Sequence, residues 1–274
     1  MLRFKKQLIT CLFLGLALAG NAFAESPAHG ADHGASHDAG HNAGHGAAHH
    51  WGYQGEGAPS HWGDLDPEFK TCKVGKAQSP IDLVAATMSK GNAGGLKVNY
   101  SKVPLVLTNN GHTLQVDYQP GSTLTLGDKS YELLQFHFHN TSEHTLNGKS
   151  FPLEVHFVHK NAQGQLAVVG AFVEEGAENA ALKAVFAKAP KEVVAKQTIH
   201  GESINGADVL PANKEYMAYT GSLTTPPCTE AVSWNVLTTP VKVSKAQIAQ
   251  FETIYRDNYR PVQALNGRAV ILNK

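Results

Sequence analysis

Leu134-Gln135-Phe136-His137-Phe138-His139-Asn140 is the stretch around which this chain is organised. Its phenylalanines alternate with polar residues, the pattern of a β-strand that buries one face. In such a strand His137 and His139 lie side by side on the other face. Two neighbouring imidazoles can chelate a metal ion, so this strand predicts the core of a metal site.

A second run, Glu154-Val155-His156-Phe157-Val158-His159, follows a turn-rich connection that contains Asn147-Gly148. The turn residues predict an antiparallel hairpin that brings the two runs together. His156 and His159 differ by three positions, an odd number, so in a strand their side chains point to opposite faces. Only one of them can therefore join the two histidines of the first strand.

His156 is the favoured third ligand because it shares a face with Glu154, and Gln135 likewise shares the face of His137. A ligating imidazole usually needs such a partner to hold its second ring nitrogen. Three neutral imidazoles, with no cysteine or carboxylate among them, are typical of a catalytic zinc site with an open fourth position. The pattern thus predicts one catalytic Zn²⁺ held by His137, His139 and His156.

The composition predicts one large domain with a loop-rich β architecture. The 274 residues are 42% hydrophobic and 17% charged, and include 26 Gly and 13 Pro. The 23 basic and 23 acidic side chains balance. This balance favours neither nucleic acid nor an anionic membrane as a partner.

Residues 1–24 have the pattern of a secretory signal peptide. A basic start precedes the apolar run 8–18, and Ala22-Phe23-Ala24 is a suitable cleavage site. The apolar run is shorter than the roughly 20 residues of a membrane span, and no later segment resembles one. We therefore expect an exported protein, periplasmic or secreted, with no membrane span after signal removal.

Cys72 and Cys228 are the two cysteines that remain once the signal is removed. An even pair in a protein bound for an oxidising compartment predicts a disulfide. The chain-entropy model gives such a long loop about 4–5 kcal/mol of stabilisation.

Residues 25–50 form a tract rich in His, Gly and Ala in which histidine recurs at every fourth position from 29 to 49. The glycines and the lack of an apolar face predict disorder in solution. One interpretation is a flexible soluble spacer. The favoured one is a binding or buffering site for an extra divalent metal ion.

Ordered structure is expected over residues 51–274, beginning with an irregular segment packed by aromatic side chains. Strand-like runs cover 96–100, 103–108, 113–118, 122–126, 131–139, 153–159 and 166–172. Helical spacing is found in 177–188 and in 244–255, the latter with Ser244 as N-cap. The short spacing of the strands predicts a mainly antiparallel sheet with peripheral helices.

The chain resembles the α-class carbonic anhydrases, in the exported bacterial form, from about Trp51 to Leu272. The motifs that carry the resemblance are Trp51-Gly52-Tyr53, His61-Trp62, Gln78-Ser79-Pro80-Ile81-Asp82, Asn109-Asn110-Gly111-His112, Gln135-Phe136-His137-Phe138-His139, Ser142-Glu143-His144, Glu154-Val155-His156, Leu166-Ala167-Val168-Val169-Gly170, Tyr219-Thr220-Gly221-Ser222-Leu223-Thr224-Thr225-Pro226-Pro227-Cys228 and Asn258-Tyr259-Arg260-Pro261. So many matches in the same order are highly specific.

The resemblance implies a mainly β (α+β) single domain with a central, mostly antiparallel twisted sheet of about ten strands. It implies a zinc lyase that reversibly hydrates carbon dioxide to bicarbonate and a proton by zinc hydroxide attack. The family's zinc ligands correspond to His137, His139 and His156, and the residues that hold the second ring nitrogens of such ligands correspond to Gln135 and Glu154.

Other family residues are implied by position. Thr224 corresponds to the residue that accepts a hydrogen bond from the hydroxide and donates to a buried carboxylate, here Glu143, and Thr225 to a neighbouring substrate contact. The hydrophobic wall for carbon dioxide corresponds to Val158, Val168, Leu223, Val232 and Trp234. His112 corresponds to the family's proton shuttle. An ordinary imidazole pKa near 6.5 suits such proton transfer to buffer. Tyr53, Asn110 and Gln135 would line the water path to it.

Two features depart from the family pattern: Asn140-Thr141, where members vary, and the His-rich tract, which lies outside the family core. The tract suggests an alternative, a non-enzymatic zinc-binding protein built on a carbonic anhydrase scaffold that has lost its catalytic activity. Such a protein is expected to have lost a ligand, whereas the ligands, Glu143 and Thr224 are all present. The two functions can also coexist in one chain.

Overall fold

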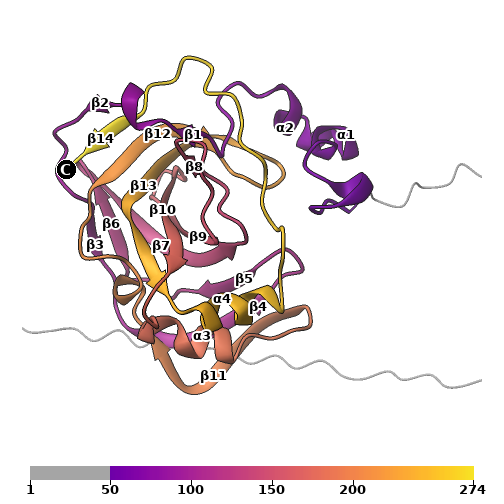
Figure 1. Cartoon of the computed structure of the whole chain (residues 1–274), viewed down its shortest axis with the longest axis vertical. Coiled ribbons are helices and arrows are strands. Elements are labelled where there is room, and N and C mark those ends of the chain that lie inside the picture. The colour runs from indigo at the N-terminus through magenta and orange to yellow at the C-terminus, as the bar shows by residue number, and fades with distance from the viewer. Residues whose placement is uncertain (1–49) are drawn as a thin grey trace, which may run out of the picture. The chain divides into compact units, whose positions relative to one another are not determined.

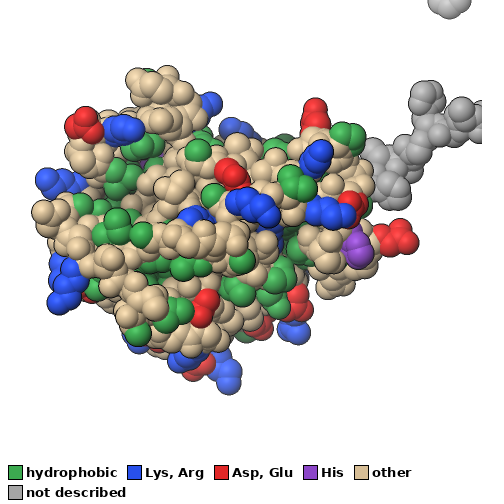
Figure 2. Space-filling model, turned by 90° about the horizontal axis from the view of Figure 1, so that it is seen from above, with side chains coloured by type: hydrophobic (Ala, Val, Ile, Leu, Met, Phe, Trp, Pro, Cys, Tyr) green, Lys and Arg blue, Asp and Glu red, His purple; other side chains and the backbone are tan. Residues whose placement is uncertain are grey.

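The computed structural model describes residues 50–274. The expected signal segment 1–24, and the His-rich tract except for His50, lie outside the described residues. Within 50–274, no helix has the length and apolar character needed to cross a membrane. On the face shown in Figure 2, acidic and basic side chains are interspersed, in keeping with the balanced composition.

A twisted sheet of 12 strands dominates the fold (Figure 1). Its strands are β2 (Ser89–Lys90), β3 (Lys97–Asn99), β4 (Val103–Asn109), β5 (Leu114–Asp117), β6 (Thr123–Leu126), β7 (Lys129–His139), β9 (Leu153–Lys160), β10 (Leu166–Glu175), β11 (Val194–Ile204), β12 (Tyr216–Ser222), β13 (Glu230–Val243) and β14 (Ile271–Asn273). Their order is β11-β4-β5-β7-β9-β10-β13-β12-β14-β2, and β6 pairs with both β7 and β3. Most pairs are antiparallel, whereas β10/β13 and β14/β2 are parallel. A separate two-stranded sheet joins β1 (Asp82–Leu83) and β8 (Thr145–Leu146).

The predicted fold class, mainly β with a mostly antiparallel sheet, is confirmed, and all seven predicted runs form strands. The 12 strands of the sheet agree with the expected number of about ten, but the long strands β11, β12 and β13 and the short strands β2 and β14 were not among the seven runs. β11 is an exposed strand at one end of the sheet and shows no apolar alternation. β12 and β13 have stretches buried on both faces, which also removes the period of two.

The helices are short. They are η1 (Gly55–Gly57), α1 (Trp62–Leu65), η2 (Pro67–Phe69), α2 (Thr71–Val74), η3 (Ala85–Thr87), η4 (Ala180–Leu182), α3 (Lys183–Ala187), η5 (Gly206–Asp208) and α4 (Lys245–Glu252). The two predicted helices correspond to η4 with α3 and to α4. Ser244 caps α4 as predicted, through a reciprocal capping box with Gln247.

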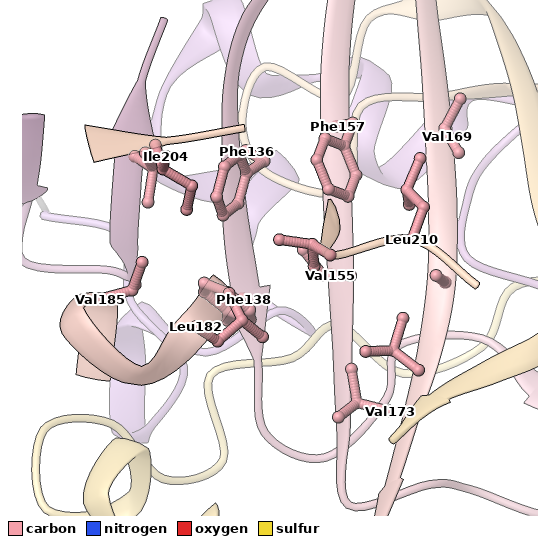
Figure 3. Close-up of a cluster of buried hydrophobic side chains, with 14 of the residues drawn as sticks. Phe136, Phe138, Val155, Phe157, Val169, Val173, Leu182, Val185, Ile204 and Leu210 are labelled. Carbon is pink, nitrogen blue, oxygen red and sulfur yellow. The ribbon is translucent and has the colours of Figure 1, made fainter. Parts of the chain in front are cut away.

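The alternation in β7 and β9 divides the sheet into an apolar and a polar face around these strands. Phe136 and Phe138 of β7 point into the main core, together with Val155 and Phe157 of β9 (Figure 3). The helices α3 and α4 cover this core, where Phe186 and Phe251 pack against Phe138. Tyr131 and Leu133 are also buried, because a register shift between Leu133 and Gln135 reverses the alternation at the exposed Leu134. Beyond this shift, burial of Phe136 and Phe138 fixes His137 and His139 on the opposite face.

The segment before the sheet packs around Trp62, as expected for an irregular region held by aromatic side chains. Trp62 is fully buried, and its indole nitrogen donates to the carbonyl groups of Gly52 and Gly57 at 2.8 and 2.9 Å. Trp51 and Tyr53 pack edge-on against it. Trp51 and Tyr53 also line a cavity beside His137 and His139.

Candidate metal centre

Three histidines converge on the polar face of the sheet. His137 of β7 pairs directly with His156 of β9, and His139 lies two residues further along β7. One ring nitrogen of each lies within 4.8 Å of those of the other two. The structure thus brings together the three histidines that were selected because alternate residues of a strand share one face.

Each of the three rings is held through its other nitrogen. His137 Nδ1 lies 2.8 Å from Gln135 Oε1, His139 Nδ1 lies 2.8 Å from the Asn258 carbonyl oxygen, and His156 Nε2 lies 2.8 Å from Glu154 Oε1. Gln135 and Glu154 take the positions that parity predicted. Asn258 was not predicted, because it contributes only a backbone carbonyl, a group that every residue carries.

The remaining ring nitrogens are free to bind a ligand. His139 Nε2 is buried with no hydrogen-bond partner among the described residues. An unpaired buried nitrogen costs free energy unless something occupies the space next to it. The free atoms are therefore His137 Nε2, His139 Nε2 and His156 Nδ1, a set of three nitrogen donors.

Burial keeps these imidazoles neutral. It lowers the pKa of His137 well below its usual value, helped by the neighbouring His139 and His156, and lowers the pKa of His139 to about 4. Burial also lowers the pKa of His156, although Glu154 opposes this effect. A neutral imidazole is the form that coordinates metal, so the site needs no proton release from these rings near neutral pH.

Glu154 is the centre of a buried hydrogen-bond network. Besides His156, it accepts hydrogen bonds from the backbone N–H of His144 and from His144 Nδ1, each at 2.8 Å. His144 Nε2 lies 2.7 Å from the Tyr219 hydroxyl, which in turn contacts Ser79. Burial alone would raise the pKa of Glu154, but the two imidazoles lower it well below its usual value.

This network also explains why His144, Glu154 and His156 do not form a second metal site, although their ligand atoms are equally close. Both ring nitrogens of His144 already have hydrogen-bond partners. Sequence reasoning gave His144 no role. It lies in the connection between two strands, where no periodicity indicates which way a side chain points.

Glu143 is a fully buried carboxyl group beside the three histidines. Its Oε1 atom accepts a hydrogen bond from the backbone N–H of Arg260 at 2.8 Å and lies 3.5 Å from His139 Nδ1. Burial raises the pKa of Glu143 to about 7, against the opposing effects of His156, the Thr224 hydroxyl and the Arg260 amide. Thr224 is itself buried, and its hydroxyl lies close enough to Glu143 to lower the pKa of that carboxyl group, so the two residues expected to act as a pair are neighbours.

A cavity of about 220 Å³ opens beside His137 and His139. Tyr53, Asn110, His112, Gln135 and Thr225 line it, as expected from the resemblance. Trp51, Thr113 and Gln115 also line it and were not predicted. The alternation of Leu114 and Val116 with Gln115 was the available signal, because it places Gln115 on a polar face.

His112 lies at the edge of this cavity and is half-buried. Its ring stacks on Trp51, with ring centroids 3.6 Å apart and planes inclined by 10°. Its backbone N–H donates to Asn110 Oδ1 at 2.9 Å, which fixes the turn that carries it. Burial, followed by the proximity of His50, lowers the pKa of His112.

The five residues expected to form a hydrophobic wall lie in one apolar cluster. Val168, Val232 and Trp234 are buried in it, and the partly buried Val158 and Leu223 pack against them. The ring of Trp234 lies edge-on to His156, with centroids 4.8 Å apart. The cluster therefore reaches the metal centre at His156, whereas the cavity side that faces His112 is polar.

The predicted disulfide between Cys72 and Cys228 is confirmed. It joins α2 to the segment that follows Thr224 and Thr225. The backbone carbonyl of Cys72 also accepts a hydrogen bond from Arg260 Nη2 at 2.9 Å. The bridge thus ties the loop beside the metal centre to the aromatic cluster around Trp62.

Comparisons with known proteins all point to one family. The family model for eukaryotic-type carbonic anhydrase matches residues 57–274. A curated carbonic anhydrase from Nostoc sp. is 44% identical over 225 residues, covering 81% of this chain and 85% of its own. One from Klebsiella pneumoniae is 45% identical over 228 residues, covering 81% of this chain and 90% of its own. The solved α-carbonic anhydrase of Thermovibrio ammonificans, in complex with the inhibitor sulfanilamide, has a TM-score of 0.79 and 44% identity, covering 82% of this chain and 100% of its own. The chain belongs to the α-carbonic anhydrase family.

Proposed function

We propose that this protein catalyses the zinc-dependent, reversible hydration of carbon dioxide to bicarbonate and a proton. One observation carries the proposal: the half-buried His137 and the buried His139 and His156 have one ring nitrogen each within 4.8 Å of the other two, while their other nitrogens are held by Gln135, Glu154 and the Asn258 carbonyl. Family membership supports the same reaction.

The donor set fits zinc. Three neutral nitrogen donors leave a fourth position open, as catalytic zinc sites do, and the held second nitrogens fix the orientation of the rings. Zinc bound by His137, His139 and His156 would lower the pKa of a water molecule to about 7, the value established for carbonic anhydrase, so that hydroxide is available at neutral pH.

Glu143 and Thr224 would orient the attacking oxygen. The backbone of Arg260 holds Glu143, and the Thr224 hydroxyl lies close enough to stabilise the ionised carboxylate. If Thr224 donates its proton to Glu143, its oxygen can accept a hydrogen bond from the nucleophile. Fixing this direction lowers the entropic part of the barrier.

The apolar cluster would receive carbon dioxide, which is itself apolar. Val158, Leu223 and Trp234 belong to this cluster, and Trp234 contacts His156. Thr225, which lines the polar cavity, would contact substrate or bicarbonate. The substrate would then lie on the apolar side of the metal centre and water on the polar side.

His112 would carry the proton out. It lies at the cavity edge with Tyr53 and Asn110, and its partial exposure allows exchange with buffer. An imidazole can receive the proton through water and pass it on to buffer, and the lowered pKa of His112 favours the release step.

We also propose that the protein is exported and that the tract 25–50 binds an additional divalent metal ion. Export is supported by the signal pattern of 1–24 and by the disulfide, which needs an oxidising compartment.

The metal content of the purified protein tests whether the tract 25–50 binds metal. More than one bound zinc, falling to one when residues 26–50 are deleted, is expected.

A stopped-flow assay of carbon dioxide hydration tests the main proposal. We expect rapid hydration that is lost after zinc chelation and restored by adding zinc. A protein that holds one zinc ion yet does not accelerate hydration would overturn the proposal and favour the non-enzymatic alternative.

A further inference from the structure

Two glutamine side chains in the cavity, Gln115 of β5 and Gln135 of β7, form part of a compact polar block. In the strand register, Gln115 lies opposite His137, and Asp117 lies opposite Gln135. All four residues have the same parity, so their side chains share the polar face and are near neighbours. Both glutamines line the cavity beside the metal centre.

The amide orientation of Gln135 follows from the role of His137. His137 can offer the lone pair of Nε2 only if its proton is on Nδ1, so Nδ1 must donate to Gln135 Oε1, 2.8 Å away. The amide oxygen is thereby occupied. Gln135 Nε2, which has no partner among the described residues, remains available to donate into the cavity.

The amide orientation of Gln115 is the opposite one. Its Nε2 donates to Asp117 Oδ1 at 2.8 Å, and a carboxylate can only accept hydrogen bonds. Its Oε1, without a partner in the described chain, therefore remains available to accept from the cavity. Gln115 and Gln135 thus present an acceptor and a donor to the same space.

Asp117 is in turn held in place. Its Oδ2 accepts a hydrogen bond from Thr108 Oγ1 on β4 at 2.6 Å, and its side chain is only 13% exposed. The ammonium group of Lys196 lies 4.0 Å from Oδ1. These contacts fix the carboxylate at the end of the polar row furthest from the metal centre.

We propose that Asp117 is a positioning residue for proton release. Asp117 fixes the Gln115 amide so that Gln115 Oε1 accepts hydrogen bonds from the cavity, while Gln135 Nε2 donates into it. Water molecules between these two groups would then all orient their hydrogen bonds in one direction. This inference rests on the proposed hydration function. It concerns the transfer of the proton through water, so it predicts no change in the conversion of carbon dioxide itself.

The test is Asp117→Asn, whose side-chain amide can offer Gln115 either a donor or an acceptor and so no longer fixes it. In weak buffer we expect kcat to fall about three- to tenfold, the scale of one hydrogen bond. We expect kcat/KM and zinc content to stay unchanged and added imidazole to restore kcat. Glu132→Gln is the matched control, because Glu132 lies on β7, accepts from the Gly121 amide and does not line the cavity.

A second measurement does not depend on activity. The side-chain amide protons of Gln115, assigned in NMR spectra with Gln115→Met, should exchange slowly in the wild type and rapidly in Asp117→Asn. An unchanged kcat in Asp117→Asn, a parallel fall of kcat and kcat/KM, or unaltered amide exchange would each overturn the inference. An inactive zinc-loaded wild type would instead overturn the proposed function.

Discussion

His156 and His159 lie three residues apart on β9 and are both buried, yet the two faces of the strand use imidazole in opposite ways. His156 has one nitrogen held by Glu154 and the other directed to the metal centre. His159 has both nitrogens occupied: Nε2 lies 2.7 Å from the Tyr100 hydroxyl and Nδ1 lies 3.2 Å from the Ala167 carbonyl. Burial lowers the pKa of both rings.

Neither burial nor a lowered pKa therefore distinguishes a metal ligand from a structural histidine in this protein. The distinguishing feature is one ring nitrogen without a hydrogen-bond partner, while the other nitrogen of the same ring has one. His139 Nε2 meets this description directly. The predictions that follow test whether the two faces of β9 differ in function as they differ in hydrogen bonding.

Removing a ligand should have the largest effect. His139→Ala leaves two protein ligands, too few to retain zinc, so we expect loss of both bound zinc and hydration activity. Zinc content by mass spectrometry and stopped-flow rates would show this. Full zinc occupancy with normal turnover would contradict the ligand assignment.

Loosening a ligand should have a smaller effect. Glu154 now accepts from the His144 and His156 rings at Oε1 and from the His144 backbone N–H at Oε2. Glu154→Gln keeps the size of the side chain, but its single amide oxygen cannot serve all three donors and its NH₂ group opposes one of them. We expect zinc affinity to fall about 10- to 100-fold, as is usual for partners that orient a ligand. Competition with a chelator measures this affinity, and an affinity equal to that of Glu132→Gln would show that orientation by Glu154 is unimportant.

His112 extends the comparison to a histidine that is only half-buried. His112→Ala should lower turnover about tenfold in weak buffer and be rescued by imidazole, because a diffusing base can replace the relay. Deleting residues 26–50 should leave turnover unchanged under the same conditions. A deletion that slows turnover as much as His112→Ala would place the tract in the proton path.

Replacing His159 should affect stability but leave zinc affinity and turnover unchanged. His159→Phe leaves the Tyr100 hydroxyl without its partner, at a cost of about 1–3 kcal/mol at pH 7. A change in zinc affinity in this variant would show that the two faces of β9 are coupled.

The same variant has a predicted pH dependence. Burial lowers the pKa of His159 to about 4, whereas an unfolded histidine titrates near 6.5, so the unfolded chain binds this proton more readily. The free energy of unfolding contributed by His159 should therefore fall as pH drops from about 6.5 towards 4, by up to about 3 kcal/mol. Urea titrations of zinc-free protein at pH 7 and 5 should show the wild type losing more stability than His159→Phe.

Much of the sheet and of the metal centre could be predicted because both depend on alternation. Where one face of a strand is apolar, as in β7, parity assigns each side chain to a face, and this selected His137, His139, His156, Gln135 and Glu154. β11, β12 and β13 lack this contrast and were missed.

Contacts between distant segments could not be predicted in the same way. Asn258 acts through a backbone carbonyl, which leaves no mark on residue type, and His144 lies in a connection without periodicity. Gln115 and Asp117 could be assigned to a polar face. Their alignment with His137 and Gln135 depends on strand register, which the sequence leaves open.

The Asn258 and Arg260 contacts also bear on the order in which the protein can fold. His137 and His139 lie two residues apart on one strand. However, the Asn258 carbonyl that holds His139 lies 119 residues after it, the Arg260 amide that holds Glu143 lies 117 residues after that glutamate, and the disulfide spans 156 residues. Contacts of such high sequence separation form slowly, because a long loop must close before they contribute. Early folding intermediates would therefore contain the hairpin of β7 and β9 with mobile imidazoles. Tight metal binding would accompany the last step, when the C-terminal segment docks.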